Sequence, residues 1–365
     1  MAVPLFASSL EPHHEALAER IAAVVRSGRY ILGPEVAAFE SELAGYIGVA
    51  HCVGVANGTD ALTIALRALG VRAGDDVVCP SFTFYATAEA IVNAGVRPVF
   101  CDVDRATACV TAETVERALT PRTRAIVPVH LFGNVAPADE LRRFDVPVLE
   151  DAAQAIGAAR GERRAAALGH AGTFSFFPSK NLPCLGDGGA IVTDDEDTAR
   201  AARMLRFHGS ADKQTFEAVG YNSRLDELQA AVLRLLLPEL DGWSEARRAA
   251  AAAYERHGIG AVAGLRVLEP APGANPVHHL YVVLHDRADE LAAALGERGV
   301  QARGYYRVPV HRQPAMVEFA SADLPATDEL ARSNLALPMG TGLTDGQVGE
   351  VVEALRSAVE QLATP

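Results

Sequence analysis

The sequence lacks the features that mark several classes of protein. It has no basic excess, because 33 Lys and Arg residues stand against 46 Asp and Glu, for a formal net charge of -13. Nucleic acids and anionic membrane surfaces are usually bound by a basic face. It also has no run of about 18 apolar residues, the length that crosses a bilayer. The sequence therefore predicts neither a nucleic-acid-binding protein nor a membrane-spanning one.

Cysteine is scarce and irregularly placed. The five cysteines form an odd set without a CxxC pair, which fits neither a disulfide framework nor a zinc knuckle. The first twenty residues lack the basic region of a secretory signal. The histidines at 13–14 and 278–279 have no metal-site spacing. We expect a cytoplasmic protein with no metal.

Lysine is nearly absent. Of the 33 basic residues, only Lys180 and Lys213 are lysines, so the sequence uses arginine for almost every other positive charge. Arginine cannot replace lysine where a deprotonated primary amine does the chemistry. Each lysine is therefore a candidate functional residue, although a solvated surface charge is the commoner use of a lysine.

The pattern of apolar residues predicts an α/β fold. Alanine-rich helical segments separate seven short β-rich runs, at residues 51–56, 76–80, 98–102, 125–129, 147–149, 173–177 and 190–193. Strands that alternate with helices form a mainly parallel sheet covered on both faces. A long helix is predicted over 225–254, with a break at Pro238. We predict a large domain with a mainly parallel seven-stranded sheet over residues 1–240, and a smaller C-terminal α+β domain over 241–365.

Lys180 lies between a predicted strand and a glycine-rich turn at 186–189. At a strand end, among apolar and aromatic side chains, desolvation would lower the pKa of its amine. A low pKa suits an amine that forms a Schiff base. A turn lysine followed by glycines that the backbone requires is an equally good interpretation of this segment alone.

Other polar residues also follow predicted strands. Asp151 could pair with a protonated ring nitrogen of a cofactor, or simply cap a helix. Gly58 and Thr59 open a helix and could bind a phosphate, although the segment matches neither GxGxxG nor a P-loop. The aromatic residues of 80–87 could cover a planar ring or pack in the core. Because the carboxyl ends of parallel strands meet at one edge, the combination indicates a single cofactor site.

These motifs together resemble the DegT/DnrJ/EryC1/StrS family of sugar aminotransferases, which belong to the fold-type I (aspartate aminotransferase-like) pyridoxal-phosphate enzymes. The resemblance spans about residues 10–355. The matching segments are Asn57-Gly-Thr-Asp-Ala-Leu, Pro80-Ser-Phe-Thr-Phe-Tyr-Ala-Thr, Val129-His-Leu-Phe-Gly, Glu150-Asp-Ala-Ala-Gln, Ser175-Phe-Phe-Pro-Ser-Lys-Asn-Leu, Gly186-Asp-Gly-Gly and Gly220-Tyr-Asn-Ser-Arg-Leu-Asp-Glu-Leu-Gln-Ala-Ala.

The resemblance implies pyridoxal 5'-phosphate as cofactor and a role for each matching residue. Lys180 would carry the cofactor as a Schiff base and move protons, and Asp151 would pair with the pyridine nitrogen. The other implied cofactor contacts are Gly58, Thr59 and Ser175 at the phosphate, Gln154 near the ring hydroxyl, Phe84 over the ring, and Asn222 reaching the phosphate from the neighbouring subunit of a homodimer. Lys213 would contact the nucleotide diphosphate, and Tyr306 and His311 would lie near the substrate.

The implied function is transfer of an amino group from an amino-acid donor, with L-glutamate the usual one, to a keto group of a nucleotide-linked (dTDP, UDP or GDP) keto-deoxysugar. Segment 208–224 resembles the branch that aminates carbon 3 more than the branch that aminates carbon 4. Two alternatives stay open, an aminocyclitol (keto-inositol) aminotransferase and a non-catalytic regulator on the same scaffold. A dehydratase branch has histidine in place of the lysine, so Lys180 weighs against it.

Three departures from the family pattern bear on the substrate rather than on the cofactor. They are Pro183-Cys184 after the lysine segment, Tyr305-Tyr306-Arg307 where the family has His-Tyr-Pro, and Gly340 in place of a common histidine. We expect all three positions to border the substrate.

Overall fold

The computed structural model describes residues 2–8, 10–320 and 323–363, and the seven predicted strands all form. They are β1 (His51–Val55), β2 (Asp76–Pro80), β3 (Arg97–Cys101), β4 (Thr123–Ile126), β5 (Leu149–Asp151), β8 (Ala171–Ser175) and β9 (Gly189–Thr193). Four strands pair in the order β1-β9-β8-β5 and three in the order β3-β2-β4. Parallel bridges from Ile126 to Val148 and from Val129 to Asp151 join the two sets. Only β9 runs antiparallel to its neighbours, which confirms a mainly parallel sheet.

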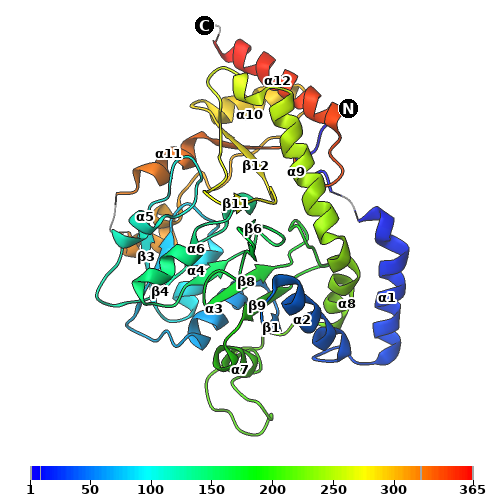
Figure 1. Cartoon of the computed structure of the whole chain (residues 1–365), viewed down its shortest axis with the longest axis vertical. Helices are drawn as coiled ribbons and strands as arrows, with labels where there is room; N and C mark the ends of the chain where they lie inside the picture. Colours follow the sequence, from blue (N-terminus) through cyan, green and yellow to red (C-terminus); the bar gives the residue numbers. More distant parts are fainter. Residues whose placement is uncertain (1, 9, 321–322, 364–365) are drawn as a thin grey trace.

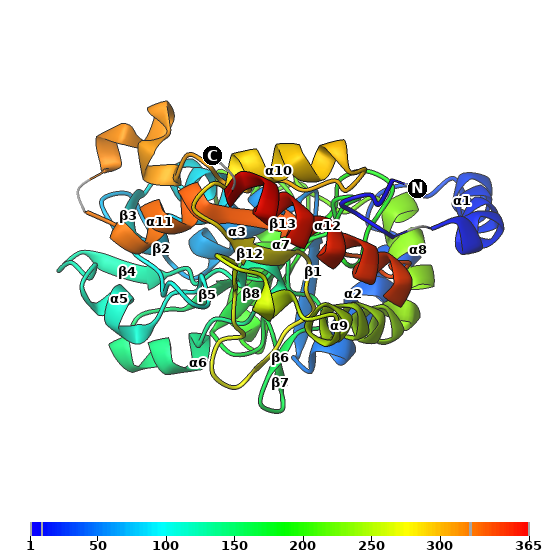
Figure 2. The same ribbon diagram turned by 90° about the horizontal axis from the view of Figure 1, so that it is seen from above.

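Successive side chains along a strand point to opposite faces of the sheet, so neighbouring residues pack in different cores. On β2, Val77 and Cys79 belong to one buried cluster and Val78 to another. This is the period-2 pattern of a strand that is buried on both faces. The helices of this part are α1 (His14–Ser27), α2 (Pro34–Ile47), α3 (Gly58–Ala68), α4 (Ala86–Asn93), α5 (Ala112–Glu116), α6 (Ala138–Leu141), α7 (Glu196–Leu205) and α8 (Glu227–Leu236). Their arrangement around the sheet can be followed in Figures 1 and 2.

The predicted long helix forms with its break at the expected place. A 3-10 turn, Leu237–Glu239, contains Pro238 and separates α8 from α9 (Leu240–Arg256). In Figure 1, α9 runs from the large sheet toward the C-terminal part of the chain.

The C-terminal part is built on a second sheet with its own core. Strands β10 (Arg266–Val267), β12 (Tyr281–Leu284) and β13 (Asn334–Leu337) pair antiparallel, and Tyr254 of α9 stacks on Tyr281 with ring centroids 4.4 Å apart. The N-terminal segment joins this part, because Val3 bridges to Val300 and Phe6 to Met339. The remaining α-helices and strands are α10 (Ala288–Glu297), α11 (Pro325–Ser333), α12 (Asp345–Ala363) and the short strands β6 (Ala159–Arg160), β7 (Arg163–Arg164) and β11 (Ala274–Asn275). The domain boundary at 240/241 stays a prediction.

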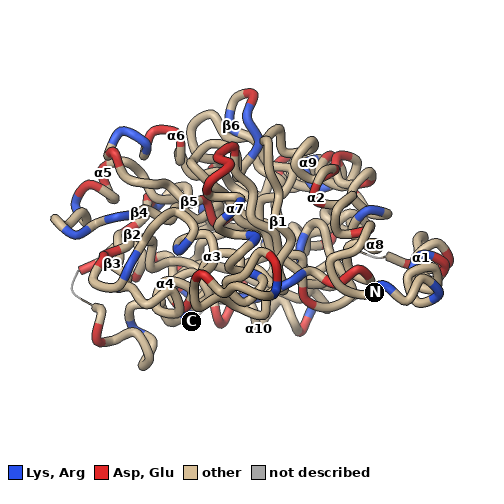
Figure 3. The backbone as a smooth tube through the Cα atoms, turned by 90° about the horizontal axis from the view of Figure 1, so that it is seen from below, with Lys and Arg blue, Asp and Glu red and all other residues tan. Residues whose placement is uncertain are grey.

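Charge is dispersed over the molecule. Figure 3 shows acidic and basic residues interspersed along the backbone. Among the described residues, no helix combines the length and the apolar character that a membrane span requires, and no group of three or more His, Cys, Asp or Glu side chains is placed to hold a metal ion.

Candidate active site

The predicted cofactor residues other than Asn222 lie at one edge of the large sheet. Strands β1, β2, β5 and β8 all point the same way, so their carboxyl ends meet there. The residues at or just after these ends are Gly58 and Thr59 after β1, Phe84 after β2, Asp151 and Gln154 at the end of β5, and Ser175 and Lys180 at the end of β8.

Lys180 lies in the turn between β8 and β9, where its N–H donates to the carbonyl of Phe177 (2.8 Å). Its side chain lines a cavity of about 360 Å³. Burial lowers the pKa of the Lys180 ammonium to about 8, while the negative charge of Asp151 opposes the shift. The amine therefore changes protonation near neutral pH, as a nucleophile and proton carrier must.

The lowered pKa predicts how the lysine reacts with an aldehyde. Only the neutral amine attacks a carbonyl, so condensation of cofactor-free protein with pyridoxal phosphate should accelerate as pH rises and level off above about pH 8. An ordinary lysine has a pKa of about 10.4. Stopped-flow absorbance at a series of pH values measures this rate. A rate that still rises between pH 9 and pH 10 would contradict the assignment.

Asp151 is held in place by a contact that the sequence did not reveal. Its Oδ2 accepts a hydrogen bond from Thr87 Oγ1 (2.9 Å), and its Oδ1 accepts from the N–H of Ala153 (3.2 Å). Thr87 belongs to α4 and also bonds to the Thr83 hydroxyl (3.0 Å). A carboxylate offers about four lone-pair positions. Two of them are used here, which leaves room for a cofactor ring N–H.

A tight backbone cradle forms where β1 meets α3. Asn57 caps the helix by accepting from the N–H of Asp60 (2.8 Å), and the first N–H groups of a helix have no partner within the helix. A Cβ placed on Gly58 would lie only 2.7 Å from the Cβ of Ser175. The glycine therefore keeps open the space between two predicted phosphate contacts, as an anion site at a helix N-terminus requires.

Filling this cradle should destabilise the protein. We expect Gly58→Ala to lower the free energy of unfolding by about 1–3 kcal/mol through overpacking against Ser175, and to weaken cofactor binding. Gly45 on α2 is the matched control, because nothing lies within 4 Å of a Cβ there. Gly45→Ala should raise stability by about 0.5–1 kcal/mol. Denaturant unfolding measures both changes, and equal effects at the two sites would refute the close approach.

Gln154 and Tyr306 are directly connected. The Gln154 Oε1 accepts from the N–H of Phe132 (2.7 Å), and its Nε2 donates to the Tyr306 hydroxyl (3.0 Å). The Tyr306 ring stacks on Phe132 and lies 6.0 Å, between centroids, from the ring of Phe84. Phe84 is 56% exposed. An aromatic ring this open is not core packing, and it is free to cover a planar cofactor.

The other three predicted residues lie on different segments. His311 is buried, with its Nδ1 2.6 Å from Ser81 Oγ. Lys213 lies between α7 and α8 with its Nζ 5.1 Å from the centroid of the Phe207 ring, and Asn222 forms a backbone bridge to Phe207. Asn222 itself is exposed. The roles of these three residues stay predictions.

Two of the three sequence departures make close packing contacts, and the expectation that all three border the substrate stays a prediction. A Cβ on Gly340 would lie 2.2 Å from the backbone of Ala7, so a histidine has no room there. Arg307 donates to the carbonyls of Ala331 and Asn334 (3.0 and 2.7 Å). Pro183, by contrast, lines the cavity beside Lys180.

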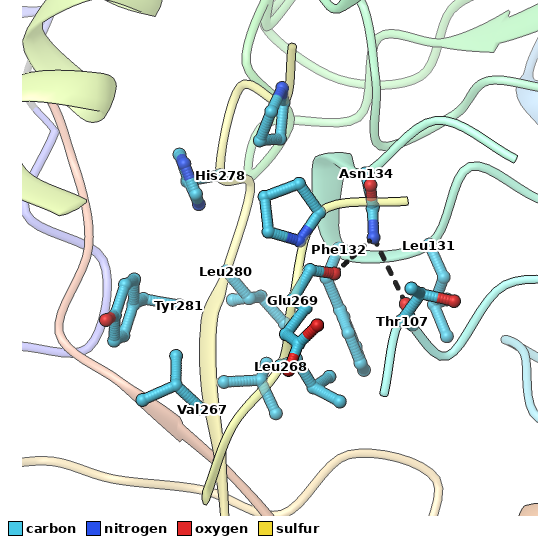
Figure 4. Close-up of a pocket in the computed structure, with 13 residues that line it drawn as sticks. Thr107, Leu131, Phe132, Asn134, Val267, Leu268, Glu269, His278, Leu280 and Tyr281 are labelled. Carbon is cyan, nitrogen blue, oxygen red and sulfur yellow. Dashed lines mark hydrogen bonds between the residues drawn. The ribbon is translucent and has the colours of Figure 1, made fainter. Parts of the chain in front are cut away.

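A second pocket, shown in Figure 4, is far smaller, about 40 Å³. Asn134 Nδ2 donates to the carbonyls of Thr107 (3.1 Å) and Glu269 (3.0 Å) at its wall. These bonds tie the loop after β4 to the chain around β10. We therefore assign this pocket to packing and the cavity beside Lys180 to chemistry.

Comparison with known proteins agrees with this geometry. The model of the DegT/DnrJ/EryC1/StrS aminotransferase family matches residues 12–356. A dTDP-3-amino-3,4,6-trideoxy-alpha-D-glucose transaminase from Streptomyces venezuelae is 44% identical over 359 residues, which cover 96% of this chain and 94% of that one. A pleiotropic regulatory protein from Geobacillus stearothermophilus is 43% identical over 339 residues, 91% of each chain. The crystal structure of DesV from S. venezuelae, in complex with a ketimine intermediate, superposes with a TM-score of 0.95 at 43% identity, and covers 98% of this chain and 99% of that one.

Proposed function

The chain belongs to the DegT/DnrJ/EryC1/StrS aminotransferase family, and from this premise we propose that it is a pyridoxal-phosphate-dependent transaminase of nucleotide-linked keto-sugars, in deoxyaminosugar biosynthesis. The observation that carries the proposal is the proximity of Lys180 and Asp151 at one edge of the sheet, where burial lowers the pKa of the lysine to about 8 and the charge of Asp151 opposes the shift. Few chemistries need a deprotonated lysine beside a buried carboxylate.

The residues present fit the cofactor. Lys180 would bind its aldehyde carbon as a Schiff base, Asp151 would pair with its ring nitrogen, and Phe84 would cover one face of its ring. Gly58, Thr59 and Ser175 would hold its phosphate in the cradle that a Cβ would fill. When bound, pyridoxal phosphate supplies an electron sink for the bonds to the substrate's α carbon.

Lys180 has two tasks in this proposal. Its amine would hold the cofactor until the amino donor replaces it, and the freed amine would then move the proton between the donor's α carbon and the cofactor carbon. A pKa of about 8 keeps both protonation states populated near neutral pH. The Thr87 hydroxyl keeps the Asp151 carboxylate oriented throughout.

We propose L-glutamate as the donor and a 3-keto sugar as the acceptor. The 44% identical transaminase from S. venezuelae, named for a 3-amino sugar, supports carbon 3. Lys213 would contact the diphosphate. The five cysteines are free and buried, which suits the reducing cytoplasm.

We also propose a homodimer in which Asn222 completes the partner's phosphate site. Large apolar side chains are exposed beside the site and on the segment that precedes α2, where a second subunit would cover them. They are Tyr30, Ile31, Leu32, Phe84, Phe177 and Leu185. Gel filtration with an activity assay tests this proposal, since an active monomer would remove it.

A regulator without turnover is the second candidate, because one relative carries a regulatory name. The retained Lys180 and Asp151 favour the enzyme. A competition assay separates the candidates: glutamate is supplied with a dTDP-linked 3-keto sugar, its 4-keto isomer and a keto-inositol. We expect the 3-amino sugar as the main product. Preferred amination of the keto-inositol would identify an aminocyclitol enzyme, and no amination of any acceptor would favour the regulator.

A further inference from the structure

The cavity beside Lys180 contains a second positive charge that the sequence did not single out. Arg247 lies on the buried face of α9 and is only 4% exposed. It lines the same cavity as Lys180. None of the other lining residues, among them Ser8, Asn181 and Trp243, is charged. The lining, as far as the structure describes it, therefore holds two basic side chains and no acidic one.

Arg247 is held by neutral oxygens only. Its Nη1 donates to the carbonyl of His278 (3.1 Å) and its Nη2 to the hydroxyl of Ser8 (3.2 Å). Its Nε is buried without a hydrogen-bond partner in the described structure. Burial lowers the pKa of the guanidinium to about 10. A buried charge with an unused N–H is costly unless an anion completes the site.

Among the described residues, no acidic side chain shifts the pKa of Arg247, which burial alone lowers. Burial, and then the nearby charges of Lys180 and Arg247, lower the pKa of His279. It is therefore neutral, with its Nδ1 3.1 Å from Asn181 Oδ1. Arg248, the next residue of α9, differs, because its guanidinium pairs with Glu245.

From this geometry we infer that Arg247 binds a carboxylate of the amino-acid donor. The inference rests on the proposed transaminase function. The donor's α-carboxylate is attached to the carbon that carries the reacting nitrogen, so it must lie in the cavity that holds the Lys180 amine. A planar guanidinium with a free Nε–H suits a carboxylate. The diphosphate of a nucleotide-linked sugar is separated from the reacting carbon by the sugar ring, and Lys213 is its predicted contact.

The two half-reactions of a transaminase test this inference separately. Glutamate and the amino-sugar product each convert the cofactor to its amino form, but only glutamate has a carboxylate. We expect Arg247→Met to slow the glutamate half-reaction, as kcat/KM, on the order of 100-fold, mainly through weaker binding. The amino-sugar half-reaction should change by less than about threefold. Arg247→Lys keeps the charge without the planar fork, so it should lose about tenfold.

Arg248→Met is the matched control, because it removes the same charge one residue away on α9, where Glu245 already compensates it. It should leave both half-reactions at the wild-type level. Equal slowing of both half-reactions by Arg247→Met would overturn the inference in favour of a structural role. Slowing of the amino-sugar half-reaction alone would overturn it in favour of the diphosphate. Thermal unfolding of each variant shows whether it is folded. If Arg247→Met does not fold, Arg247→Lys, the milder replacement, provides the same comparison of the two half-reactions.

A binding measurement tests the inference without turnover. Trp243 is the only tryptophan of the sequence and lines the same cavity. Titrating the holoenzyme with glutarate, a dicarboxylate without an amine, should change its fluorescence in wild type and in Arg248→Met, but not in Arg247→Met. Absence of a response in wild type would overturn the carboxylate site. If glutarate binds while no amino acid reacts, the proposed function fails and the carboxylate site stands.

Discussion

Replacing Lys180 by alanine is expected to lower turnover by about 10⁴-fold or more, the upper range for loss of a general acid–base group. The reason is that one amine both holds the cofactor and moves the proton. Lys180→Arg should be equally inactive, although it keeps the positive charge, because a guanidinium cannot be deprotonated at these pH values. Steady-state rates of the two variants and wild type measure the effect.

The scarcity of lysine provides a second readout for the same prediction. Borohydride reduction fixes a Schiff base as a stable adduct, and Lys180 and Lys213 are the only side chains of the sequence that could carry one. Peptide mass mapping of reduced wild type should place the adduct on Lys180, and neither variant should be labelled. A Lys180→Ala protein with wild-type turnover would contradict the proposed mechanism. An adduct on Lys213 would move the catalytic role to that residue.

Asp151→Asn is expected to lower kcat on the order of 10²–10³-fold, the usual loss when one preorganised electrostatic partner is removed. A carboxylate keeps a ring nitrogen protonated, whereas a neutral amide does not. The amide oxygen can still accept from Thr87, whose hydroxyl is 2.9 Å from the carboxylate. The local structure should therefore survive, and Lys180 should still bind the cofactor.

Thr87→Val tests the same carboxylate with a smaller expected effect. It removes one hydrogen bond to Asp151 and keeps its charge, so kcat should fall only about tenfold, in line with about 1 kcal/mol for one bond. Cofactor absorbance of both variants shows whether binding is intact. An Asp151→Asn enzyme with wild-type kcat, or a Thr87→Val enzyme that is the more impaired of the two, would contradict the role assigned to the carboxylate.

The fold could be predicted because each strand of the large sheet is a short β-rich run that a helical segment separates from the next. The strand predicted over 76–80 is buried on both faces, as expected for a parallel sheet that helices cover on both sides. Polar residues after such runs must meet at one sheet edge, so the proximity of Lys180 and Asp151 followed from the topology alone. The antiparallel direction of β9 did not follow, because strand composition does not encode strand direction.

The contacts that orient the site could not be predicted, because they join residues far apart in the sequence. Gln154 bonds to Tyr306 across 152 positions, and Arg247 bonds to Ser8 across 239. No local pattern distinguishes Arg247 from the other arginines. Its function becomes visible only when α9 places it in the cavity that holds Lys180.

We propose that this chain holds pyridoxal phosphate on Lys180 and accepts an amino group from glutamate. The most direct test is the visible absorption spectrum of the purified protein, supplied with pyridoxal phosphate, before and after glutamate is added. We predict a yellow protein whose visible band bleaches as the cofactor takes the amino group. A protein that stays colourless with pyridoxal phosphate, or whose band does not respond to any amino acid, would contradict the claim and favour the regulator.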